Sequence, residues 1–125
     1  MTESKSDNIV YALTKGTDNP EMVIIAFTHA VGALAMDVGA KLVLMGPAVN
    51  LAQKGAAKHV KYEGLTPLDT LLANFLEMGG ELYLCTPCVK GRDYDEKTDL
   101  IEQAKPIAAA VYTQMLLDAS AVVSY

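Results

Sequence analysis

The chain has 125 residues, the length of one ordinary domain, and 51% of them are hydrophobic, which excludes a disordered chain. Ten basic against fifteen acidic residues give a net charge of −5, which argues against nucleic acid or an anionic membrane as the main partner, because both attract positive surfaces. Two cysteines are too few for a disulfide framework, and they lie close together, as Cys85 and Cys88.

Short apolar runs alternate with helical patterns along the chain. In chain order we predict a strand at 8–13, a helix at 20–38, a strand at 41–45, a short helix at 49–54, a loop at 55–64, a helix at 67–78, strands at 81–85 and 104–108, a helix at 109–119 and a strand at 121–125. Strands separated by helices imply parallel pairing through crossovers. We therefore expect a single α/β domain, with a mainly parallel sheet and helices on both faces.

Local signals support several of these bounds. The first long helix has a cap in Asp18 or Asn19, a proline that suits its first position, and Gly39 as its expected end. The second long helix has Thr66 as its expected cap and a first-turn acidic residue. Pro106 cannot donate a ladder hydrogen bond, so its strand belongs at a sheet edge or begins there.

The cysteine pair is the most informative feature of the chain. In parallel sheets functional groups gather beyond the carboxyl ends of the strands, and Cys85 is expected at that end of strand 81–85. Cys88 follows a Thr-Pro step that can open a short helix or turn, and the basic side chains Lys90 and Arg92 lie nearby. Backbone N–H groups and positive charge lower the pKa of a thiol. We expect an accessible, activated thiol with a second thiol able to resolve it.

Four interpretations of the pair compete. Free cysteines are commonly small buried hydrophobes, but a loop rich in Pro, Gly and Lys makes a poor core. A zinc site needs about four ligands, and only His29 and His59 could complete one, so no metal is expected. A thioredoxin-type exchanger normally has its CxxC motif after an early strand. Sulfur carriage as a persulfide needs one nucleophilic thiolate in a positive, shielded pocket and no cofactor, and we favour it.

Three stretches also carry a resemblance to a known family, with AVVSY as a matching last strand. They are HAVGALAMDVGAKLVLMGPAV (29–49), KYEGLTPLDTLLANFLEMGG (61–80) and ELYLCTPCVKGRDY (81–94). Over nearly the whole chain these stretches resemble the DsrE/DsrF family of sulfur-relay proteins, which have the DsrE-like, or YchN-like, fold. The resemblance implies a five-stranded sheet, assembly as homotrimers or hexamers, and sulfur exchange with a partner that is often a TusA-like carrier.

The resemblance also bears on individual residues. By position the sulfur-binding cysteine of the family falls on Cys85, whereas many relatives lack a cysteine at the place of Cys88. That departure leaves open whether Cys88 is a resolving thiol, a second sulfur site or the main one. The family places the start of the first long helix near the cysteine loop, which gives His29 a pocket role.

Together these inferences predict a cytoplasmic sulfurtransferase or sulfur carrier. Cys85 would bear the persulfide with Cys88 assisting, Lys90 and Arg92 would stabilise its negative charge, and His29 would contact the substrate. The first eight residues lack an apolar signal-peptide core, and the longest apolar stretch, 22–36, is shorter than the roughly 20 residues of a membrane span. The alternatives are a non-catalytic oligomeric binding or scaffold subunit and a CxxC dithiol redox module.

Overall fold

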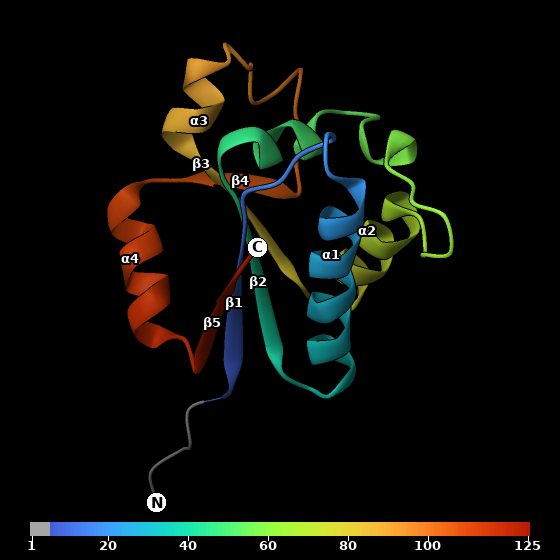
Figure 1. Ribbon diagram of the computed structural model, residues 1–125. Helices are drawn as coiled ribbons and strands as arrows, with labels where there is room; N and C mark the ends of the chain where they lie inside the picture. Colours follow the sequence, from blue (N-terminus) through green and yellow to red (C-terminus); the bar gives the residue numbers. More distant parts are fainter. Residues whose placement is uncertain (1–5) are drawn as a thin grey trace, which may run out of the picture.

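The computed structural model describes residues 6–125, and its strands form one sheet with helices on both sides (Figure 1). The strands are β1 (Asn8–Leu13), β2 (Gly39–Leu44), β3 (Glu81–Cys85), β4 (Ala104–Ile107) and β5 (Ala121–Ser124). The helices are α1 (Pro20–Ala35), α2 (Leu68–Glu77), α3 (Thr86–Gly91) and α4 (Ala109–Asp118), with 3-10 segments η1 (Gly46–Ala52) and η2 (Ala57–His59).

The sheet has the strand order β4-β3-β2-β1-β5, and every neighbouring pair in it is parallel. The expected α/β fold with a five-stranded parallel sheet is confirmed. Pro106 lies in β4, at one edge, where its missing N–H costs no ladder bond. Because parallel strands all end at the same side of a sheet, the segments after β2, β3 and β4 meet beyond one end of it.

Alternating side chains divide the strands between the two faces of the sheet. The face under α1 and α2 holds the main hydrophobic core, with buried residues from three strands: Tyr11, Leu13, Leu42, Leu44, Leu82 and Leu84. Phe27 of α1 and Phe75 of α2 meet edge to face there, with ring centroids 6.0 Å apart. The opposite face, which carries the buried Val10 and Val43, is covered by α4 (Figure 1).

Two helix ends differ from the sequence prediction. α1 ends at Ala35, earlier than the predicted Val38, because Asp37 takes a left-handed conformation with φ of 60° and turns the chain into β2. Gly39 is therefore the first residue of β2 and not the stop of the helix. At α2, Pro67 occupies the cap position with no side-chain cap bond, so Thr66 does not cap this helix.

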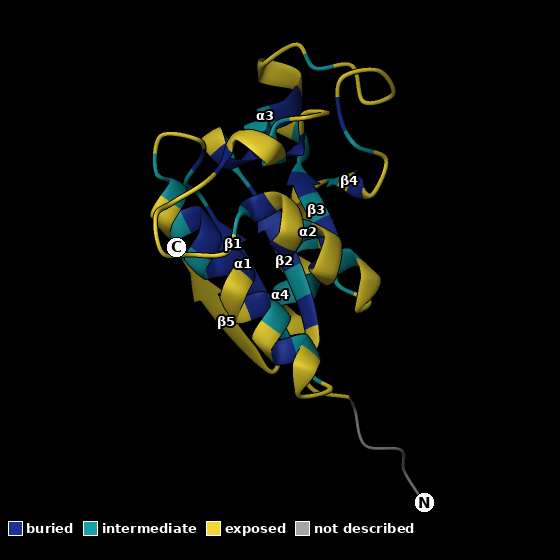
Figure 2. Cartoon of the chain, turned by 90° about the vertical axis from the view of Figure 1, so that its right-hand side faces the viewer, coloured by how far each residue is buried: buried dark blue, intermediate teal, exposed yellow. Residues whose placement is uncertain are grey.

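The outer side of α4 and the edge strand β5 are open to solvent. No residue of α4 is buried. All four residues of β5 are exposed, and Figure 2 shows this strand in yellow. Leu117 is 74% exposed and Val122 is 49% exposed. Within residues 6–125, no helix combines the length and the apolar character needed to cross a bilayer.

Candidate functional site

The two cysteines come together at the junction of β3 and α3. β3 ends at Cys85, which is the cap residue of α3, so Cys88 follows within the first turn of the helix. Both are free and half-buried, and their Sγ atoms lie 2.8 Å apart. Thr86 fixes the start of the helix, because its hydroxyl donates a hydrogen bond of 2.7 Å to the carbonyl of Ile107 in β4. The sequence prediction of a cysteine pair at a strand end is confirmed.

A backbone group from the neighbouring strand also reaches this site. Gly46 begins η1 just after β2, which pairs with β3, and its N–H donates to the Cys88 Sγ over 3.2 Å. Gly46 has a φ of 59°, a left-handed conformation that suits glycine. An N–H dipole directed at a sulfur atom favours negative charge there. This contact was not predicted from the sequence, although parallel pairing brings the segments after β2 and β3 together.

Burial is the main cause of the shifted pKa of Cys85. Desolvation raises the pKa of Cys85 above its ordinary value, and the neighbouring Cys88 thiol raises it further. The backbone N–H of Cys88 and the charge of Arg92 act in the opposite direction but do not outweigh these effects. The expected lowering of the pKa is therefore wrong for Cys85. Loss of water around the sulfur exceeds the stabilisation by nearby donors and positive charge.

An apolar pocket of about 140 Å³ opens beside the Cys85 thiol. It lies on the α4 face of the sheet and is lined by residues at the ends of β2, β3 and β4 and in α3 and α4: Val43, Met45, Cys85, Pro87, Ile107, Ala108, Ala109 and Tyr112. None of these side chains is charged at neutral pH, and Cys88 is not among them. The pocket therefore offers the Cys85 sulfur a shielded space that disfavours charged reagents.

The other predicted site residues do not all lie near the cysteine pair. Arg92 is exposed and donates from Nη1 to the Cys88 carbonyl over 3.2 Å, so it lies beside the pair. Lys90 is exposed in the last turn of α3. His29 does not lie near the cysteines, because its Nδ1 contacts the hydroxyl of Tyr125, just after β5. β5 lies three strands away from β3 in the sheet, which corresponds to roughly 14 Å.

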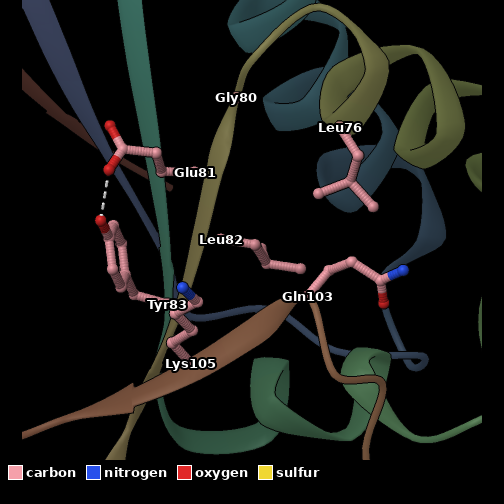
Figure 3. Close-up of a pocket in the computed structure, with 7 residues that line it drawn as sticks. All are labelled: Leu76, Gly80, Glu81, Leu82, Tyr83, Gln103 and Lys105. Carbon is pink, nitrogen blue, oxygen red and sulfur yellow. Dashed lines mark hydrogen bonds between the residues drawn. The ribbon is translucent and has the colours of Figure 1, made fainter.

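A second hollow, of about 270 Å³, lies at the other end of β3 (Figure 3). Leu76, Leu82, Gln103 and Lys105 border it, and the Tyr83 hydroxyl donates to Glu81 nearby. Burial and this Glu81 bond raise the pKa of Tyr83 to about 12. No cysteine lines this hollow. Among residues 6–125, no three His, Cys, Asp or Glu side chains group as ligands of a metal ion would.

A curated protein is similar to this chain in sequence. An uncharacterized protein of Methanocaldococcus jannaschii is 31% identical over 107 residues, a match that covers 86% of this chain and 38% of that protein. The chain thus spans well under half the length of that curated relative.

Solved structures share the fold at low sequence identity. The YchN protein of E. coli aligns with a TM-score of 0.79 and 19% identity, covering 95% of this chain and 99% of that one. A protein of unknown function from Methanobacterium thermoautotrophicum aligns with a TM-score of 0.74 and 14% identity, over 96% of this chain and 100% of that one. These identities establish the fold alone. The model of the DsrE/DsrF-like family matches residues 7–125, and the chain belongs to that family.

Proposed function

We propose that this chain is a sulfur carrier that accepts sulfane sulfur on Cys85 as a persulfide and passes it to an acceptor thiol. One observation carries the proposal. A free thiol beside an apolar pocket lies 2.8 Å from a second free thiol, in a chain of the DsrE/DsrF-like family, which is related to sulfur relay. Sulfane sulfur transfer needs a reachable thiol and protection of the product from water, and a half-buried cysteine beside an apolar pocket offers both.

The loading step uses groups that are already in place. The Cys85 thiol first loses its proton to water, and because burial raises its pKa, only a small fraction of it is thiolate at neutral pH. The Cys85 thiolate then attacks the outer sulfur of a donor persulfide, R–S–SH. A new S–S bond forms at Cys85 and the donor S–S bond breaks. The leaving group R–S⁻ then takes up a proton from water. Arg92 and Lys90 would favour the negative charge of the persulfide.

Intact-protein mass spectrometry tests this function. We expect the reduced wild type to gain the mass of one sulfur atom shortly after a small-molecule persulfide is added. A variant with both Cys85→Ser and Cys88→Ser should gain none. Equal gains in the two proteins, or no gain in either the wild type or a Cys88→Ser variant, would remove the proposal. Retention of partner binding by the double variant would then support the scaffold alternative.

Self-association is a further part of the proposal. Val111 and Leu117 of α4 and Val122 of β5 are apolar and largely exposed, which is unfavourable for a surface facing water. We propose a homotrimer or hexamer that covers them, with a TusA-like thiol protein as the exchange partner. Leu117→Glu should shift the sedimentation of the protein towards the monomer. An unchanged oligomer, or a monomeric wild type, would contradict this role of α4.

A dithiol redox module is the second candidate, and the 2.8 Å separation of the sulfurs favours it. Such a module would cycle between a Cys85–Cys88 disulfide and the dithiol. It would catalyse the reduction of insulin by a small dithiol, whereas a carrier alone would not. Insulin reduction without any sulfur uptake would select this candidate.

A further inference from the structure

The Cys85 thiol has two different neighbours. Cys88 Sγ lies 2.8 Å away. Cys85 also lines the pocket of about 140 Å³, which Cys88 does not line. A water molecule has a share of about 30 Å³ in the liquid, so a single added sulfur atom fits the pocket with room to spare. The outer sulfur of a Cys85 persulfide would therefore have space in a pocket that Cys88 does not line.

This arrangement suits a displacement at the inner sulfur. A thiolate that attacks a sulfur–sulfur bond approaches one sulfur while the other leaves from the opposite side. Cys88 lies within reach of the inner sulfur, and the pocket has room for the leaving group. A covalent S–S bond is about 2.05 Å long, so the two protein sulfurs need to approach by only about 0.8 Å more.

The surroundings of Cys88 prepare it for this attack. The Gly46 N–H is directed at its sulfur from 3.2 Å away and favours negative charge there. The Cys88 sulfur does not line the pocket through which a donor would reach Cys85. Cys88 is thus better placed to react with a neighbouring persulfide than with an incoming donor.

We propose that Cys88 resolves the Cys85 persulfide and releases hydrogen sulfide, which makes the chain a thiol-dependent persulfide reductase. This inference rests on the proposed sulfur loading of Cys85. The Cys88 thiolate forms a bond to the inner sulfur, the bond between inner and outer sulfur breaks, and the outer sulfur leaves as HS⁻ and takes up the proton that Cys88 lost. The outer sulfur gains two electrons, and the two cysteines lose two as they form a disulfide. A dithiol such as dithiothreitol then reduces the disulfide and restores the pair.

A single-turnover experiment tests the inference. The reduced, full-length protein is mixed with glutathione persulfide under anaerobic conditions without added reductant, and protein mass and free sulfide are followed in time. Glutathione is the leaving group of the loading step, so sulfide reports the second step. Cys88→Ser is the matched variant, because its hydroxyl can still accept the Gly46 N–H. Cys88→Ala is measured as well, and it also reports background resolution by released glutathione.

The wild type should gain one sulfur transiently, then lose the mass of two hydrogens and release one sulfide per chain. Both Cys88 variants should keep the added sulfur and release sulfide at least about tenfold more slowly. A wild type that keeps its sulfur as long as these variants do would overturn the inference and leave the carrier function standing. Loading by Cys85→Ser but not by Cys88→Ser would also overturn it, because the roles would be reversed. No loading in any protein would remove the carrier function itself.

Discussion

The Gly46 N–H donates to the Cys88 sulfur over 3.2 Å, although the two residues lie 42 positions apart in the chain. Two neighbouring parallel strands, β2 and β3, make this contact by ending side by side. Among the described residues, it is the only hydrogen bond to a cysteine sulfur that comes from outside the segment 85–92. The contact links the segment after β2 to the cysteine segment after β3, and it can be altered without changing either cysteine.

Gly46→Ala tests the role of this contact. A Cβ at Gly46 meets nothing within 4 Å, but a φ of 59° strains an alanine, so we expect a loss of about 1–2 kcal/mol in the free energy of unfolding. The strained N–H should shift away from the sulfur and slow alkylation of Cys88 by iodoacetamide, measured by peptide mapping. Gly64→Ala is the control, since Gly64 also has a positive φ and open space but no sulfur nearby. Equal alkylation in both variants would argue against the contact.

Arg92→Ala tests how far the charge of Arg92 affects the pKa of Cys85. The positive charge of Arg92 lowers the pKa of Cys85, so its removal should raise that pKa further and reduce the thiolate fraction near neutral pH. We expect alkylation of Cys85 to slow by roughly twofold, since an exposed charge acts weakly through water. Lys90→Ala, which removes an equal charge from the same helix, is the control. A larger effect of Lys90→Ala would assign the electrostatic role to that residue instead.

Gly80 tests how tightly the core is packed at the α2–β3 turn. A Cβ at Gly80 would lie 2.4 Å from the ring of Phe75, which is fully buried against Phe27. Gly80→Ala should therefore reduce the free energy of unfolding by about 1–3 kcal/mol in urea titrations. Gly32→Ala in α1 meets nothing within 4 Å and should stabilise the helix by about 0.5–1 kcal/mol. A stabilising Gly80→Ala would show that Phe75 moves freely, contrary to this packing.

Stability at alkaline pH should depend on Tyr83. Its pKa is raised from 10.0 to about 12, so between these values the unfolded chain loses a proton that the folded chain keeps. Rising pH then favours unfolding, and the stabilisation present below pH 10.0 is lost as pH approaches about 12. Tyr83→Phe should flatten this decline in urea titrations, and Glu81→Gln should flatten it less, because burial is the main cause of the shift. An equal decline in Tyr83→Phe would assign the effect to other groups.

Local features of the sequence predicted much of this structure. β3 has the predicted bounds, because an apolar run between a Gly-Gly stop and a Thr-Pro step is a local signal. The pairing of Cys85 with Cys88 also follows from their spacing across a strand end and a helix turn. The end of α1 was less predictable, since Asp37 takes a left-handed turn that is usually the role of glycine.

Features that depend on distant segments could not be predicted in the same way. The pocket at Cys85 needs Tyr112 of α4 and Ile107 of β4, and their positions follow from the complete sheet order. The raised pKa of Cys85 has burial as its main cause, which the charges of neighbouring residues do not reveal. The contact of His29 with Tyr125 likewise depends on the last strand returning beside β1. Each of these features arises from tertiary packing.

Sulfur loading of single-cysteine variants shows which thiol carries the sulfur. Reduced Cys88→Ser, Cys85→Ser and the double variant are each mixed anaerobically with glutathione persulfide, and their intact masses are measured after the excess donor is removed. We predict one added sulfur atom on Cys88→Ser, located on the peptide that carries Cys85, and none on the double variant. An unmodified Cys88→Ser, or equal sulfur on the double variant, would contradict the assignment of Cys85 as the sulfur-carrying thiol.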